Sequence, residues 1–379
     1  MQLPSCLSSL NEAVHSTIFT ARHTRGARHR AYIARAMPRK PLALAIETVD
    51  DDDADADDPA AASSTPGAYS LSETMTFAQD GIILKGMQGM RLDGSPTSNI
   101  TLADLEKQRV LGSGATSRVH LVKHRKTGEL LALKELMAMA DADTRRMAVN
   151  ELRLASSAHA EHLVRFVDAF FDDGKISILM EFADGGSLDD VIKASGGGVP
   201  AGPLGMITCQ MLHGLQYLHK ERHQVHRDLK PANCMLTRGG HVKLSDFGIS
   251  KQLESTDAFA VTQCGTTQYM APERLQGDDY SYVADCWSVG VCVLEALHGK
   301  MPYPAAKSFI DQVVMITQGA APQPPPDAGL AVKEFTDLCL KKAAAERASV
   351  RTLLQGAWMR QHAAARPKDL AAYLESILA

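Results

Sequence analysis

The chain has 379 residues, of which 45% are hydrophobic and 22% are charged, and its formal net charge is -4. This composition excludes collagen-like, coiled-coil and wholly disordered chains, and the near-neutral charge gives no electrostatic reason to expect nucleic acid or an acidic membrane as a partner. The seven cysteines lack CxxC or metal-ligand spacing, so we expect reduced thiols in a cytoplasmic protein, with the nucleus as a second compartment, and no stretch predicts a membrane span.

Residues 1–70 form a tail whose two halves carry opposite charge. Residues 1–40 hold seven basic residues and one acid, whereas residues 41–66 hold eight acids and no base. Because few of these residues could join a hydrophobic core, we expect the tail to be disordered. Its arginine-rich start has the composition of an organelle transit peptide, but a solvated basic tail, or translation that starts at Met37, explains it as well.

Ordered structure is expected from about Tyr69, through a lead-in over residues 71–104 and into a strand-rich region. Residues 109–122 alternate in a strand pattern, and residues 130–136 predict another strand after a turn at 126–128. Farther along, the pattern becomes mostly helical. We therefore expect an α+β protein with a small β-rich lobe, a larger helical lobe and a ligand site in the cleft.

A glycine-rich turn and a lysine mark the first lobe. Residues 112–117 are all small, which alone indicates only a tight turn. Lys134 would share a strand face with Ala132, which puts a charge on an apolar surface. The helical pattern over residues 141–158 has one charge on its inward face, Glu151. A buried ammonium and a buried carboxylate are tolerable as a pair, so we predict that Lys134 meets Glu151; the alternative is that Glu151 reaches solvent.

The most specific strings are His-Arg-Asp-Leu-Lys-Pro-Ala-Asn at residues 226–233 and Asp-Phe-Gly at residues 246–248. They match the catalytic loop and the metal motif of protein kinases, in the expected order after a glycine-rich loop and a strand lysine. Residues from about 110 to about 362 thus resemble a eukaryotic protein kinase domain. The resemblance implies the bilobal kinase fold, with the domain placed at residues 105–362.

The same resemblance assigns catalytic roles. Asp228 would orient the substrate hydroxyl and accept its proton, Lys230 would contact the transferred phosphate, and Lys134, paired with Glu151, would bind the α- and β-phosphates of ATP. Oxygen ligands suit Mg²⁺, and the resemblance implies two of them: Asn233 and Asp246.

The resemblance also outlines an ATP site. Met180 would be the gatekeeper, and the backbones of Glu181 and Ala183 would bond adenine. Ser117 replaces the third glycine of the usual loop and leaves a small side chain there. The residues implied to bind ATP are Leu111, Gly112, Ser113, Gly114, Ala115, Thr116, Ser117, Arg118, Val119, Ala132, Lys134, Met180, Glu181 and Ala183.

Three residues of the second lobe have structural roles by the same resemblance. Glu273 would pair with Arg347, and Asp285 would cap the helix that anchors the catalytic loop. Residues 363–379 end the chain in a segment whose apolar spacing predicts a short helix packed on the large lobe. In the family, the C-terminal end of the domain also receives the upstream kinase.

Three longer strings, at residues 180–188, 246–250 and 265–274, resemble the mitogen-activated protein kinase kinases, and the segment from Phe77 is similar to plant and algal members. This implies a dual-specificity kinase that phosphorylates Thr and Tyr in the activation loop of a downstream mitogen-activated protein kinase. An upstream kinase kinase kinase would activate it in a signalling cascade.

Members of this family carry two activating phosphosites. Thr256 and Thr262 have the family's spacing, and Ser255 competes for the first position. A phosphate adds about -1.5 to -2 charges at neutral pH, which could draw Arg227 and neighbouring bases into an ordered activation loop.

The basic half of the tail ends in a possible docking peptide for the downstream kinase. A basic pair is followed, after a short spacer, by alternating leucines that could fill successive pockets of a partner. Its residues are Arg39, Lys40, Leu42 and Leu44.

Two alternatives remain open from the sequence. The enzyme could be a serine/threonine kinase of another tier of the same group, in which case the docking peptide is fortuitous. A pseudokinase or scaffold would bind partners without catalysis. Five intact residues argue against the scaffold: Lys134, Glu151, Asp228, Asn233 and Asp246.

Overall fold

A computed structural model describes residues 69–72, 76–79, 82–85, 89–92, 95–96, 98–114, 117–136, 152, 155–172, 175–247 and 266–378. The predicted disordered tail, apart from its last two residues, and the predicted docking peptide lie outside the described residues. The predicted phosphosites lie outside them as well.

The lead-in contains a sheet that the sequence did not reveal. Its five strands follow one another in an antiparallel meander, which we call the lead-in sheet. The strands are β1 (Tyr69–Ser72), β2 (Thr76–Gln79), β3 (Ile82–Lys85), β4 (Met90–Leu92) and β5 (Ser95–Pro96). Leu84 and Met90 face each other across β3 and β4, and both are fully buried. Strands of two to four residues are too short for an alternating pattern to stand out.

A second antiparallel sheet follows in the order β6-β7-β8-β10-β9. Its strands are β6 (Leu105–Ser113), β7 (Ser117–His124), β8 (Leu130–Leu136), β9 (Phe166–Asp172) and β10 (Lys175–Glu181). The expected strand over residues 130–136 is confirmed. Side chains alternate between the two faces, so Ile178 belongs to one hydrophobic cluster and Leu179 to another. We call these clusters the first and the second face cluster.

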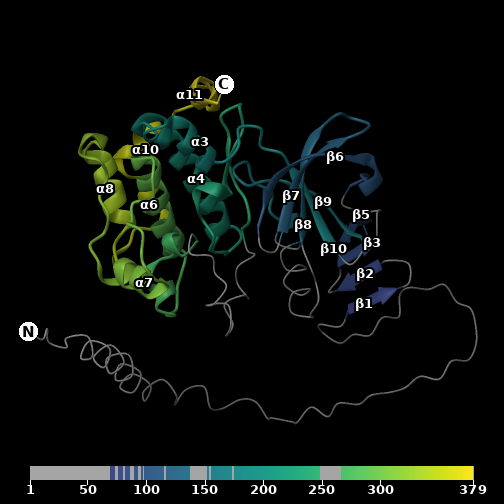
Figure 1. The fold of residues 1–379 in the computed structure, drawn as a ribbon, viewed down its shortest axis with the longest axis horizontal. Helices are drawn as coiled ribbons and strands as arrows, with labels where there is room; N and C mark the ends of the chain where they lie inside the picture. Colours follow the sequence, from purple (N-terminus) through teal and green to yellow (C-terminus); the bar gives the residue numbers. More distant parts are fainter. Residues whose placement is uncertain are drawn as a thin grey trace, which may run out of the picture. The chain divides into compact units, whose positions relative to one another are not determined.

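The remaining part of the chain is mainly helical (Figure 1), which confirms the α+β class. Its α-helices are α3 (Leu188–Ser195), α4 (Ala201–Lys220), α5 (Pro272–Leu275), α6 (Val283–His298), α7 (Phe309–Gln318), α8 (Leu330–Cys339), α9 (Val350–Leu354), α10 (Ala357–His362) and α11 (Pro367–Ile377). A hairpin of β11 (Cys234–Leu236) and β12 (Val242–Leu244) lies between α4 and α5. Short 3₁₀ helices are η2 (Leu102–Asp104), η3 (Pro231–Asn233), η6 (Thr266–Tyr269), η7 (Pro326–Ala328) and η8 (Ala344–Glu346).

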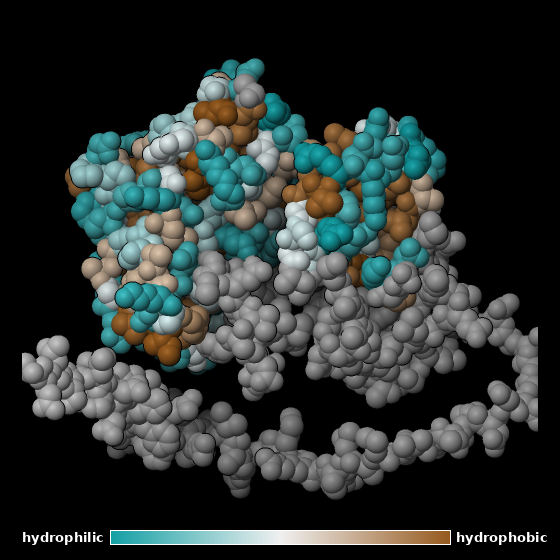
Figure 2. All heavy atoms as spheres, in the orientation of Figure 1, coloured by the Kyte–Doolittle hydropathy of each residue, from teal (hydrophilic) through white to brown (hydrophobic). Residues whose placement is uncertain are grey.

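Helix α6 lies at the centre of the helical part. Twelve of its sixteen residues are buried, among them Trp287 at 0% exposure. A helix that is buried over most of its circumference must be surrounded by protein, and α6 packs against α3, α4 and α8. The visible face of the described residues is mostly hydrophilic with scattered apolar patches (Figure 2). Within the described part of the chain, no helix is long and apolar enough to cross a membrane.

The C-terminal helix α11 contacts α3 and α4 and buries Leu370 and Leu374. The turn of the β11–β12 hairpin approaches the start of this helix closely. At Gly240, φ is +84°, and a Cβ there would lie 1.9 Å from the carbonyl oxygen of Pro367. Only glycine fits this contact.

Five cysteines occur among the described residues, and all are buried free thiols. Burial raises the pKa of each of these thiols. They are Cys209, Cys234, Cys286, Cys292 and Cys339.

Candidate active site

The loop that carries residues 226–233 is anchored by one buried carboxylate. Asp285, at 1% exposure, accepts hydrogen bonds from the backbone N–H groups of His226 (2.8 Å) and Arg227 (3.0 Å) and from Nε2 of His219 (2.8 Å). The prediction that Asp285 caps its helix is wrong, because the N-cap is Tyr282 and Asp285 is the third residue of α6, within its first turn. Its carboxylate faces the loop, and it stabilises the loop backbone instead.

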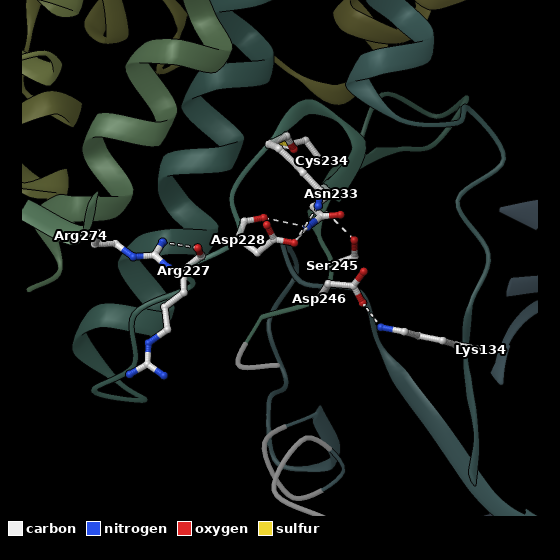
Figure 3. Close-up of polar contacts among 9 residues, drawn as sticks. Lys134, Arg227, Asp228, Asn233, Cys234, Ser245, Asp246 and Arg274 are labelled. Carbon is white, nitrogen blue, oxygen red and sulfur yellow. Dashed lines mark hydrogen bonds and ion pairs between the residues drawn. The ribbon is translucent and has the colours of Figure 1, made fainter. Parts of the chain in front are cut away.

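Asp228 lies at the centre of a polar network in this loop (Figure 3). Its Oδ2 accepts hydrogen bonds from Lys230 Nζ (2.9 Å) and Asn233 Nδ2 (2.9 Å). Asn233 Nδ2 also donates to the carbonyl oxygen of Asp228 at 2.7 Å. About a quarter of the Asp228 and Lys230 side chains is exposed, so both can meet a ligand.

Asp246 lies beside this network. The Ser245 N–H and hydroxyl both donate to the Asn233 carbonyl oxygen, at 2.9 and 3.3 Å, which fixes Asp246 beside the loop. Asp246 has φ +58°, a conformation that is uncommon outside glycine and typical of functional positions. Its Oδ1 accepts a 2.7 Å bond from Lys134 Nζ. Burial alone would raise the pKa of Asp246, but the charge and hydrogen bond of Lys134 hold it below its ordinary value.

Lys134 comes from the middle of β8 and is 6% exposed. Lys134 pairs with Val119 on β7, and Ala132 pairs with Met180 on β10. Residues opposite each other or two apart share a face, so the register confirms that Lys134 lies on the Ala132 face. The predicted partner Glu151 lies outside the described residues.

The glycine-rich segment forms the turn between β6 and β7. The Gly114 N–H donates to the Ser117 carbonyl oxygen at 2.8 Å, which ties the end of β6 to the start of β7. Ala115 and Thr116 lie outside the described residues. A Cβ built on Gly112 would meet nothing within 4 Å, so the space beside this residue is open. The turn therefore leaves room for a ligand next to the strand that holds Val119.

At the end of β10, the backbone leads from the sheet toward α3. The Glu181 carboxylate accepts a hydrogen bond from the Arg165 N–H (2.7 Å) and forms an ion pair with Lys243 Nζ (2.8 Å), so this side chain is held by the protein. Met180 is half-buried at the edge of the first face cluster, and Ala183 is 5% exposed.

These residues fit a nucleotide and a hard divalent cation. Lys134 beside Asp246 and Lys230 beside Asp228 supply two ammonium groups, and phosphates require such positive charge. With Nδ2 of Asn233 bonded to Asp228, the Oδ1 atom could meet a cation together with the Asp246 carboxylate. Among the described residues, no group of three or more His, Cys, Asp or Glu side chains forms a metal site. Mg²⁺ commonly takes one or two protein oxygens and completes its shell with phosphate and water.

The predicted ion pair between Glu273 and Arg347 is confirmed. Two hydrogen bonds, of 2.6 and 2.9 Å, join the two side chains, and both are buried. Arg347 also lies over the Trp287 ring, at 5.2 Å from its centroid. Two further arginines, Arg227 and Arg274, lie over the ring of Tyr280 at 5.7 and 5.3 Å.

Sequence reasoning missed several residues that support the site. His219 donates to Asp285, the carboxylate that anchors the catalytic loop, and Ser245 donates to Asn233 beside the metal motif. Arg274 donates to the Arg227 carbonyl oxygen. His219 is 66 residues from its partner Asp285, so no local pattern could reveal the contact. Ser245 could have been noticed, because it directly precedes Asp246.

Comparisons with known proteins agree with this geometry. The family model described as protein kinase domain matches residues 105–359. The chain is 40% identical over 265 residues to mitogen-activated protein kinase kinase 1 of Arabidopsis thaliana, which covers 68% of this chain and 75% of that protein. It is 35% identical over 319 residues to mitogen-activated protein kinase kinase 1c of Physcomitrium patens, covering 79% and 92%. Dual specificity mitogen-activated protein kinase kinase dSOR1 of Drosophila melanogaster is 36% identical over 284 residues, covering 68% and 71%.

Proposed function

Because the chain belongs to the protein kinases, and among them to the mitogen-activated protein kinase kinases, it is an ATP-dependent protein kinase, and we propose that it phosphorylates both Thr and Tyr in the activation loop of a mitogen-activated protein kinase. The observation that carries the proposal is the network that joins Asp228, Asn233 and Asp246 to two lysines. No purely binding role requires this set of groups.

In the proposed reaction, the Asp228 carboxylate receives the substrate hydroxyl and takes its proton as the oxygen attacks the γ-phosphorus of ATP. The bond from that phosphorus to the β–γ bridging oxygen breaks, and ADP leaves with the electron pair. Lys230 neutralises charge on the transferred group, and Lys134 holds the α- and β-phosphates. Asn233 and Asp246 would hold Mg²⁺, which supplies positive charge to the phosphates when bound.

Activation would depend on phosphorylation of Thr256 and Thr262, with Ser255 as the alternative first site. Two arginines among the described residues support the proposal. Arg227 and Arg274 flank one tyrosine ring, and each carries a charge that a phosphate could bind.

The partners follow from the proposed place in a cascade. A downstream mitogen-activated protein kinase would bind the tail through Arg39, Lys40, Leu42 and Leu44, and an upstream kinase would act on the activation segment. We propose that the protein works in the cytoplasm, with access to the nucleus.

The decisive experiment uses the full chain, activated by an upstream kinase, with ATP, Mg²⁺ and a catalytically inactive mitogen-activated protein kinase as substrate. We expect mass spectrometry to find phosphate on both Thr and Tyr of the substrate loop, and the Asp228→Ala variant to leave both unmodified. Labelling of Ser or Thr alone, on this or other substrates, would favour a kinase of another tier. Equal labelling by the Asp228→Ala variant would contradict the assignment of the base.

A further inference from the structure

The lead-in sheet lies outside the stretch that matches the protein kinase family, but it shares a core with that stretch. Leu84 and Met90 belong to the first face cluster together with Leu152 and Ile178, and all four are 0 or 1% exposed. Ile178 pairs directly with Lys134 across β8 and β10. Since paired residues share a face, this cluster lies on the same side of the sheet as the candidate phosphate-binding lysine.

The chain reaches the kinase domain by crossing the edge strand β9. Before the crossing, Leu84 and Met90 are buried in the first face cluster. After it, Ile100 and Leu102 pack against the second face cluster on the other side of the sheet. Apolar contacts on both faces therefore hold the lead-in across this edge.

Asp168 fixes the middle of the crossing. Its side chain is 0% exposed, and its Oδ1 accepts hydrogen bonds from the N–H groups of Met90 and Ala169, each 2.8 Å long. Its Oδ2 accepts a bond from the Ser98 hydroxyl. Gly89, at φ +87°, lies so close that a Cβ there would be 2.7 Å from Oδ2. A buried carboxylate is costly unless hydrogen bonds satisfy it, so these contacts select one path for the lead-in.

We propose that Asp168 is a positioning residue for the kinase reaction, which acts by fixing the lead-in sheet on β9 and thereby holding Leu152 in the first face cluster. Leu152 directly follows Glu151 in the sequence, so any contact that fixes Leu152 limits where Glu151 can lie. The inference rests on the proposed function and on the pairing of Glu151 with Lys134 that the sequence predicts. In this proposal, the lead-in sheet helps to position a catalytic group of the β-rich lobe.

The test compares two Leu→Ala variants of the full, activated chain. Leu84→Ala removes volume from the first face cluster on the lead-in side, and Leu105→Ala removes the same volume from the second face cluster. A substitution that acts on a catalytic group through packed side chains typically changes the rate severalfold. We therefore expect kcat of Leu84→Ala to fall about 5-fold, with KM for ATP within about 2-fold of wild type. We expect Leu105→Ala to keep its kcat at a temperature where both variants are folded.

Two further measurements separate positioning from stability. Amide hydrogen exchange over residues 152–158 should rise in Leu84→Ala and stay unchanged in Leu105→Ala. Asp168→Leu should lower kcat as Leu84→Ala does. Asp168→Asn keeps an oxygen that can accept the hydrogen bonds of Met90 and Ala169, so it should retain most of the wild-type kcat.

Equal losses of kcat in the two Leu→Ala variants, or unchanged exchange over residues 152–158 in Leu84→Ala, would overturn the proposal. If the activated wild type phosphorylates nothing, the proposed function fails. The exchange comparison still decides whether the lead-in sheet holds Leu152.

Discussion

Replacing Asp285 with alanine tests how the catalytic loop is held. The substitution removes the acceptor for three donors: the N–H groups of His226 and Arg227 and the ring nitrogen of His219. The Asp285 and His219 side chains are at most 9% exposed, and the His226 residue is 0% exposed, so water has little access to replace the lost bonds. The loop that carries Asp228 would lose its anchor.

The expected magnitude follows from the number of donors. A buried donor left without a partner costs about 1–3 kcal/mol, so we expect Asp285→Ala to lower the free energy of unfolding by about 3–5 kcal/mol. Asp285→Asn keeps one oxygen acceptor and turns an N–H₂ group toward a donor, which should cost about 1–2 kcal/mol. We expect kcat to fall in the same order, because the loop backbone positions Asp228.

Urea unfolding and steady-state kinetics on the same preparations provide the measurement. Asp189→Ala is the control, because Asp189 makes an exposed ion pair with Lys193 on α3, and such pairs contribute at most about 1 kcal/mol. A loss below about 1 kcal/mol in Asp285→Ala, similar to the control, would refute the anchor role.

The stability difference between wild type and Asp285→Ala should also depend on pH. Burial pushes the pKa of Asp285 upward, but the hydrogen bond from His219 and nearby positive charge outweigh it and hold the pKa below the ordinary 3.8. A carboxyl with a lowered folded pKa stabilises the fold above its ordinary pKa and loses that contribution as the pH falls through the folded value. The stability difference between wild type and Asp285→Ala should be full at neutral pH and shrink below pH 3.8.

Three other outcomes are expected. Arg347→Met leaves the Glu273 carboxylate buried without its cation and should cost about 3–5 kcal/mol in urea unfolding, whereas replacing both residues with apolar ones should recover much of the loss; no recovery would contradict an ion-pair penalty. Gly240→Ala should lower Tm by several degrees because its Cβ meets the start of α11, and an unchanged Tm would contradict that contact. Alanine at all four positions of the docking peptide should slow phosphorylation of a full-length kinase partner and leave a short peptide substrate unaffected; equal slowing of both would exclude docking.

The site could be predicted from the sequence where its residues lie in one string or on one strand. The segment from His226 to Asn233 carries the base, the lysine and the amide within eight residues, and alternation along β8 placed Lys134 and Ala132 on one face. In such local patterns, the spacing in the sequence alone determines which side chains lie close together or on one face.

The parts that could not be predicted depend on contacts between distant residues. Asp285 was expected to cap a helix, because sequence shows its position in the helix but not the loop across from it, 58 and 59 residues away. The role of Asp168 could not be predicted from the sequence, because its donor Met90 is 78 residues earlier in the chain. The lead-in sheet is built from strands too short to show a period.

Alkylation of the five buried cysteines described above would report local unfolding of the protein. Each thiol is buried with a raised pKa, so a thiolate-directed alkylating reagent reacts with it only after the surrounding structure opens. The order in which peptides carrying Cys234, Cys286 and Cys339 acquire label would therefore show which part of the helical core opens first.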